Sequence, residues 1–172
     1  MKAGAWFFAL IAIAYLAWIG GVKADGSGDP AVGSVANGRY LDKEGQPTYN
    51  VQPDGTVDWF TYSGFRRYHA HCHVCHGPDG EGSSYAPALA ESLKTLTYRE
   101  FLFIVADGRK NVTTSQTNVM PALGHNRDVV CYLDDIFVYL RARSNGAIER
   151  GRPPKHEDKS EMTAKAERSC RG

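Results

Sequence analysis

This sequence has almost no net charge, no internal repeat, and few cysteines and methionines. Its 172 residues hold 20 Lys and Arg against 19 Asp and Glu, with only four Cys and three Met. A charge this close to zero, with no basic stripe interleaved with aromatic residues, excludes a nucleic-acid-binding surface of the usual kind. Because no repeat is present, the chain length suits a single domain. The scarcity of Cys and Met makes the position of each one informative.

The first 24 residues have the plan of a secretory signal peptide. Lys2 is followed by an apolar run over residues 3–19 and by a small-residue V-x-A site that ends at Ala24. We expect cleavage after Ala24; since the run approaches the roughly 20 residues of a membrane span, an uncleaved anchor is the alternative. Either way the remaining chain faces an exported, periplasmic compartment. Without residues 1–24 it has 18 Lys and Arg against 19 Asp and Glu, a formal charge of −1.

The rest of the chain divides into three parts by composition. Residues 25–58 form an irregular extension rich in Gly, Pro and Asp, with a possible short hairpin around the P-D-G turn at residues 53–55. Residues 59–146 contain the helical signals. Residues 147–172 are a polar, charged tail that we expect to contribute little to a core. Its last 23 residues carry seven basic and four acidic side chains, which suits either a solvated end or an electrostatic docking arm.

Hydrophobic periodicity and capping signals predict three helices. In the first, Phe65, Tyr68 and Cys72 share one face. The second opens with a capping box formed by Thr97 and Glu100, and the third begins at an asparagine N-cap and stops at a glycine. The expected helices cover residues 61–72, 97–108 and 126–146. The spans 77–96 and 110–125 between them are expected to be loops.

The most informative motif is C-H-V-C-H at residues 72–76. Two thiols separated by two residues reach the two vinyl groups on one edge of a porphyrin, and the histidine after the second thiol lies under the iron. The motif thus predicts one covalently bound haem c, attached through Cys72 and Cys75 with His76 as an iron ligand. A redox dithiol, half of a zinc site and a small disulfide loop are the alternatives. The strand–helix alternation that a thioredoxin fold requires is missing.

Met120 is the candidate for the second axial iron ligand. It precedes Pro121 in the stretch just before the third predicted helix, 44 residues after His76, where a loop folds over the opposite face of the porphyrin. A thioether is a soft ligand that favours ferrous iron and raises the reduction potential. The alternative is that Met120 fills a gap in the core. His125 is the next candidate ligand, whereas Met162 lies in the charged tail.

For a few other residues the sequence gives a weaker indication of a functional role. Arg109 could neutralise a haem propionate, although surface charge is the commoner role of such a residue. His69 and His73 are four apart, the spacing of a metal pair, but their more ordinary position is on the solvated part of the first helix. Trp59 either packs near the haem edge or closes the core.

Residues 59–146 resemble a class I, mitochondrial-type cytochrome c. The resemblance implies an all-α fold in which the N- and C-terminal helices cross and loops enclose the haem, here with an irregular N-terminal extension and a polar C-terminal tail. It also implies that Pro87 offers its backbone carbonyl to the other ring nitrogen of His76, which fixes the imidazole and raises its basicity. The matching stretches are Gly64-Phe65, residues 72–77, Pro87-Ala88-Leu89, Met120-Pro121-Ala122 and Tyr139-Leu140-Arg141-Ala142.

A narrower resemblance covers nearly the whole exported chain. Residues 54–59, residues 76–87 and two further cysteines are similar to the four-cysteine, methanol-metabolism-related cytochromes c of methylotrophic bacteria. That resemblance implies electron transfer from a quinoprotein (PQQ) methanol or alcohol dehydrogenase to another cytochrome or a terminal oxidase.

The two further cysteines are Cys131 and Cys170. With Cys72 and Cys75 bound to haem, this pair remains in an oxidising compartment, so we hypothesise a disulfide that returns the tail to the domain. The alternative is a buried Cys131 that packs as a small apolar residue and a disordered Cys170.

The function that follows is one-electron transfer by a monomeric carrier that is not an enzyme. With protein ligands on both sides of the iron, no substrate, proton relay or nucleophile is needed, and a partner docks transiently at the haem edge. The first alternative is a haem peroxidase or gas sensor in which Met120 is displaced. The second is a haem-free dithiol.

Overall fold

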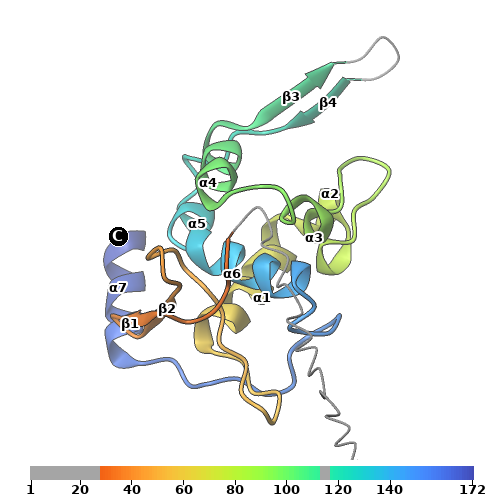
Figure 1. The fold of residues 1–172 in the computed structure, drawn as a ribbon. Helices are drawn as coiled ribbons and strands as arrows, with labels where there is room; N and C mark the ends of the chain where they lie inside the picture. The colour runs from red at the N-terminus through yellow and green to blue at the C-terminus, as the bar shows by residue number, and fades with distance from the viewer. Residues whose placement is uncertain (1–27, 113–116) are drawn as a thin grey trace, which may run out of the picture.

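A computed structural model describes residues 28–112 and 117–172 (Figure 1). The predicted signal peptide therefore lies outside the described residues. Within the part that is described, no helix is long and apolar enough to cross a membrane. The helices are α1 (Trp59–His71), α2 (His73–His76), the 3-10 helix η1 (Pro78–Gly80), α3 (Leu89–Ser92), α4 (Tyr98–Asp107), α5 (Arg127–Val130), α6 (Leu133–Ser144) and α7 (Glu161–Arg171). The strands are β1 (Ser34–Ala36), β2 (Arg39–Leu41), β3 (Arg109–Val112) and β4 (Thr117–Met120).

The core is built where α1 crosses α6, as the cytochrome c resemblance implied. Gly64 lies at the crossing, and a Cβ added there would stand only 1.9 Å from the backbone oxygen of Asp135. Only glycine allows the two backbones to approach this closely. Most of α6 is buried on all sides, and Tyr139 and Leu140 are completely covered.

Two of the three predicted helices form as single elements. α1 begins at Trp59, two residues earlier than predicted, because Asp58 caps it by accepting a hydrogen bond from the Thr61 N–H at 2.9 Å. α4 has the complete capping box: Thr97 and Glu100 satisfy each other's backbone N–H groups.

The third predicted helix is broken into α5 and α6 between Val130 and Leu133. Tyr132 has φ −128° and ψ 18°, outside the helical region. Cys131 and Tyr132 are both tied to the C-terminal helix, the first by a disulfide and the second by a hydrogen bond to Glu167. These tertiary contacts coincide with the break that local periodicity did not reveal.

The spans predicted as loops contain regular structure. Residues 77–96 include η1 and α3, and residues 110–125 include most of an antiparallel hairpin made of β3 and β4. Met120 is therefore the last residue of a strand and not part of an irregular loop.

Both ends of the described chain pack onto the helical domain. In the extension, β1 and β2 form a hairpin, and a bridge between Val51 and Val57 flanks the predicted P-D-G turn. Arg141 of α6 holds the extension through a fully buried ion pair with Asp42 at 2.9 Å. The structure also corrects the expected role of the tail: His156 stacks on Tyr62, and the segment ends in α7.

Candidate functional site

The C-H-V-C-H motif lies at the turn between α1 and α2. Cys72 ends α1 by donating its N–H to the carbonyl of Tyr68, and its own carbonyl accepts the N–H groups of Cys75 and His76. In this tight turn Cys72 is partly buried against the core and Cys75 is exposed. Neither thiol forms a disulfide, so both are available for attachment.

The surroundings of Cys72 do not suit a redox dithiol. Burial, with a smaller contribution from Cys75, raises the pKa of the Cys72 thiol to about 12. Reactive dithiols depend on a lowered thiol pKa, because the thiolate is the nucleophile. Zinc is also disfavoured, since no group of three or more His, Cys, Asp or Glu side chains in the described ranges could hold a metal ion.

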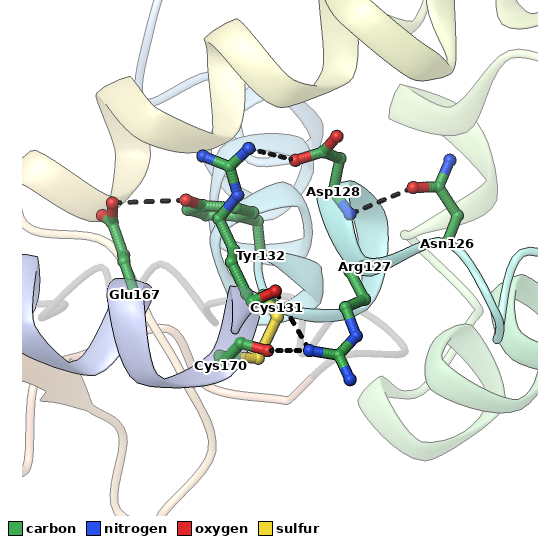
Figure 2. Close-up of a disulfide and its surroundings, with 8 residues drawn as sticks. Asn126, Arg127, Asp128, Cys131, Tyr132, Glu167 and Cys170 are labelled. Carbon is green, nitrogen blue, oxygen red and sulfur yellow. Dashed lines mark hydrogen bonds and ion pairs between the residues drawn. A yellow bond between two sulfur atoms is a disulfide. The ribbon is translucent and has the colours of Figure 1, made fainter.

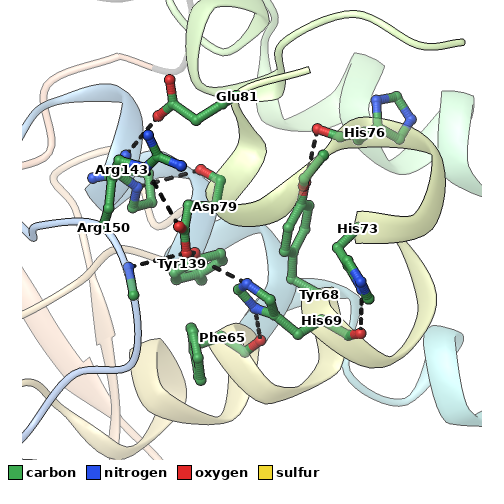
Figure 3. A network of polar contacts seen from close by, with 12 residues as sticks. Phe65, Tyr68, His69, His73, His76, Asp79, Glu81, Tyr139, Arg143 and Arg150 are labelled. Carbon is green, nitrogen blue, oxygen red and sulfur yellow. Dashed lines mark hydrogen bonds and ion pairs between the residues drawn. The ribbon is translucent and has the colours of Figure 1, made fainter. Parts of the chain in front are cut away.

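His76 is buried and its ring is held in one orientation. Its Nδ1 lies 2.9 Å from the backbone oxygen of Pro87, the contact that the class I resemblance implied. Among the described residues no partner is found for Nε2, the nitrogen that remains for iron. The hydroxyl of Tyr68 donates to the backbone oxygens of His76 and Gly77, at 3.2 and 2.6 Å (Figure 3).

Glycines close the loop behind His76. Gly77 has φ +72°, and a Cβ at this residue would lie 2.1 Å from the oxygen of Gly82. The Gly82 N–H donates to the His76 carbonyl at 2.8 Å. In addition, the Ser83 hydroxyl donates to the carbonyl of Cys75. The segment after the motif thus folds back on it and makes the Pro87 contact possible.

Asp79 connects this loop to the rest of the molecule (Figure 3). Its Oδ1 accepts the Tyr139 hydroxyl at 3.3 Å and the Gly151 N–H at 3.1 Å, and lies 3.4 Å from Nε2 of His69. Burial by itself raises the pKa of Asp79, but the Gly151 N–H, His69 and Arg150 lower it by more, so the net pKa is below its ordinary value. Asp79 is therefore a carboxylate at neutral pH.

Met120 is positioned by close backbone contacts with α4. Gly108, which ends α4 with φ +76°, approaches so closely that a Cβ there would stand 2.6 Å from the Met120 oxygen. Just beyond, Leu123 donates its N–H to the carbonyl of Val105 at 3.0 Å. The Met120 side chain is half-buried and packs against the same core cluster that borders Cys72.

The other candidates are placed as follows. Arg109 is exposed and pairs with Met120 across the β3–β4 ladder. His125, the next candidate ligand, is exposed, and Met162 is half exposed on α7. Trp59 packs with Tyr62 and His156 at the opposite end of α1 from the motif.

Both histidines of the pair, His69 and His73, contact backbone oxygens of α1. Nδ1 of His69 lies 2.9 Å from the Phe65 oxygen, and Nδ1 of His73 lies 2.6 Å from the His69 oxygen. Each ring therefore has one nitrogen against a backbone oxygen of α1.

The predicted disulfide is confirmed: Cys131 and Cys170 are bonded, across 39 residues of sequence (Figure 2). Neighbouring contacts support the same junction between α5 and α7. Arg171 forms an ion pair with Asp128 at 3.0 Å, and Arg127 donates to the backbone oxygen of Arg171. The bond holds the tail on the domain, as the hypothesis required.

Together these residues fit haem c. The motif offers two free thiols, a buried imidazole with one nitrogen already on a backbone oxygen, and a thioether held on the same core. This donor set, one imidazole and one thioether beside a C-x-x-C pair, is the ligation typical of cytochromes c.

Comparisons with known proteins also find cytochromes c. Cytochrome c-555 of Methylococcus capsulatus is 38% identical over 96 residues, which cover 55% of this chain and 72% of that protein. The chain belongs to the c-type cytochromes. Cytochrome c-553I of Paracoccus denitrificans is 55% identical over 136 residues, 79% of this cytochrome but only 60% of that protein's length.

A solved structure supports the same assignment over most of this cytochrome. The crystal structure of the c-type cytochrome XoxG from Methylobacterium extorquens AM1 matches with a TM-score of 0.76 and 53% identity. The match covers 82% of this cytochrome and 86% of that chain. No family model matches the chain. Membership of the family implies a covalently bound haem c.

Sequence reasoning missed Tyr68 and Asp79 as parts of the site. The sequence places Tyr68 only on a helix face, and Asp79 only in a predicted loop. The one available signal was that both lie within four residues of the motif; their partners, such as Tyr139, come from distant parts of the chain.

Proposed function

We propose that this cytochrome binds one haem c, with thioether bonds to Cys72 and Cys75 and with His76 and Met120 as axial ligands. The observation that carries the proposal is His76: it is buried, and Nδ1 faces the Pro87 oxygen, so Nε2 is directed elsewhere as the iron-binding nitrogen. Arg109, which faces Met120 across the ladder, is the proposed partner of a haem propionate.

The protein is proposed to act as a one-electron carrier and not as an enzyme. The bound haem supplies a ferric–ferrous couple. His76 and Met120 would hold the haem iron between them and leave no site for a substrate, while the Pro87 carbonyl and the Tyr68 hydroxyl hold the ring and the backbone of His76. A site that changes little between its two oxidation states suits electron exchange with transiently bound partners.

The proposed donor is a quinoprotein (PQQ) methanol or alcohol dehydrogenase in the periplasm, and the proposed acceptor is another cytochrome or a terminal oxidase. Support comes from the four-cysteine pattern, completed by the Cys131–Cys170 disulfide. The identities of 55% and 53% with cytochrome c-553I and XoxG extend over about four fifths of the chain.

Two measurements on the purified mature protein test this function. A haem stain on a denaturing gel should label the band, and Cys72→Ser with Cys75→Ser should abolish the label. Stopped-flow mixing with a PQQ methanol dehydrogenase and methanol should then reduce the wild-type haem. If the protein stains for haem but the dehydrogenase cannot reduce it, the proposed carrier function stands and this dehydrogenase is excluded as the donor.

A further inference from the structure

The β3–β4 hairpin extends away from the helices, with α4 at its base (Figure 1). Its register pairs Lys110 with Val119 and Val112 with Thr117. Residues directly opposite each other in a ladder share a face, and so do residues two apart on one strand. Lys110, Val112, Thr117 and Val119 therefore form one face, which we call the outer face. Met120 belongs to the opposite, inner face.

The outer face has no packing role within the described molecule. Val112 and Val119 are 62% and 63% exposed, and the side chains of Lys110 and Thr117 are exposed as well. An isolated two-stranded hairpin is marginally stable in water, and exposed valines add nothing to its stability. On the inner face Met120 packs against the core, whereas no residue of the outer face does so.

The charge of this segment is opposite to that of most of the domain. The two strands contain two basic residues, Arg109 and Lys110, and no Asp or Glu, whereas residues 25–149 as a whole carry 11 basic against 15 acidic side chains. Lys110 and Arg109 make no ion pair within the described ranges. A cationic region on an otherwise acidic domain orients the molecule toward a partner with an acidic patch.

On the basis of the electron-carrier function above, we propose that the outer face of the β3–β4 hairpin docks the electron-donating dehydrogenase through an acidic patch with an apolar centre. Val112 and Val119 supply the apolar contact, and Lys110 supplies the charge. Because Met120 ends β4, a partner bound to this hairpin lies beside the strand that carries the proposed iron ligand.

The test is the second-order rate constant for haem reduction by PQQ methanol dehydrogenase, measured by stopped flow across a range of ionic strength. Lys110→Glu should lower this rate constant about three- to tenfold at low ionic strength, with a smaller effect at high ionic strength. Val112→Ser combined with Val119→Ser should lower it at every ionic strength. Matched controls are Lys165→Glu on exposed α7 and Val35→Ser, whose side chain is 59% exposed on β1.

Reduction by ascorbate and the absorption spectrum should stay unchanged in all variants, because the substituted hairpin side chains lie on the outer face, opposite Met120, and the control residues lie on other elements. If the wild type is reduced but the hairpin variants behave like the controls, the docking role is wrong and the carrier function stands. If the dehydrogenase does not reduce the wild type, both the donor and this docking role fail. A concentration-dependent dimer that disappears in the valine variants would instead identify a second copy as the occupant and overturn the proposal.

Discussion

At the scale of single residues, His76 is held both at its ring and at its backbone. The Pro87 oxygen faces Nδ1, and the Tyr68 hydroxyl binds the backbone oxygens of His76 and Gly77. Tyr68 is completely buried, and burial raises the pKa of its phenol well above the ordinary value, so the hydroxyl remains a donor at every physiological pH. Its removal would leave two backbone acceptors with fewer partners in a dry environment.

Tyr68→Phe should therefore lower the free energy of unfolding by about 1–2 kcal/mol, the usual effect of removing one buried hydrogen-bonding group. Denaturant unfolding followed by circular dichroism measures this. Tyr85→Phe is the matched control, because Tyr85 is 76% exposed and should change stability very little. Equal stability of the two variants would show that the Tyr68 hydrogen bonds do not support the loop.

At the scale of elements, the disulfide between α5 and α7 decides how the tail is held. It closes a segment of 39 residues, and on the chain-entropy model such a cross-link contributes about 4 kcal/mol by restricting the unfolded chain. The double variant Cys131→Ser, Cys170→Ser should lose about this much stability in thermal or denaturant unfolding. Its absorption spectrum should be unchanged, since neither residue touches the motif.

Reductant provides the control for this prediction. Dithiothreitol should destabilise the wild type and leave the double variant unaffected. A wild type whose unfolding is insensitive both to reductant and to the double substitution would show that the bond does not stabilise the domain.

Local signals predicted some elements and failed for others, for physical reasons. The capping box at Thr97 and the stripe ending at Cys72 are short-range features, so α1 and α4 could be predicted from sequence. The break between α5 and α6 coincides with contacts of Cys131 and Tyr132 to α7, which lie 39 and 35 residues away in the sequence. The β3–β4 hairpin lacks a two-residue turn signal, and polar composition therefore predicted a loop.

The candidate site also contains residues that the sequence predicts and residues that it does not. Cys72, Cys75, His76 and Met120 are conspicuous because their residue types are rare and their spacing is chemically specific. Asp79 is not, since its partners Tyr139 and Gly151 lie 60 and 72 residues away. Only the folded chain brings them together.

At the scale of the whole molecule, pH acts on stability through a buried carboxylate at the α1–α6 crossing. Burial raises the pKa of Asp135 to about 6, although Arg39 and Ser63 offset part of the rise. The folded protein therefore binds a proton here more tightly than the unfolded chain does. The resulting stabilisation is complete below about pH 4 and is lost as the pH rises through 6.

The Asp135→Asn variant imitates the protonated side chain. It should therefore separate the contribution of Asp135 to the pH dependence of stability from the contributions of other titrating groups. Between pH 4 and 6.5 the wild type should lose on the order of 2 kcal/mol of unfolding free energy relative to this variant. Asp158→Asn, at an exposed position in the tail, is the control and should show no such slope. Parallel pH profiles for the wild type and Asp135→Asn would contradict the shifted pKa.

The central claim is a haem held by His76 on one side and Met120 on the other, and the absorption spectrum of the purified ferric protein tests it most directly. The wild type should show the methionine–iron charge-transfer band. Met120→Ala should abolish this band while the haem remains covalently attached through Cys72 and Cys75. A wild type without the band, or a Met120→Ala variant that keeps it, would contradict the axial ligation and favour an open haem with catalytic or gas-binding chemistry.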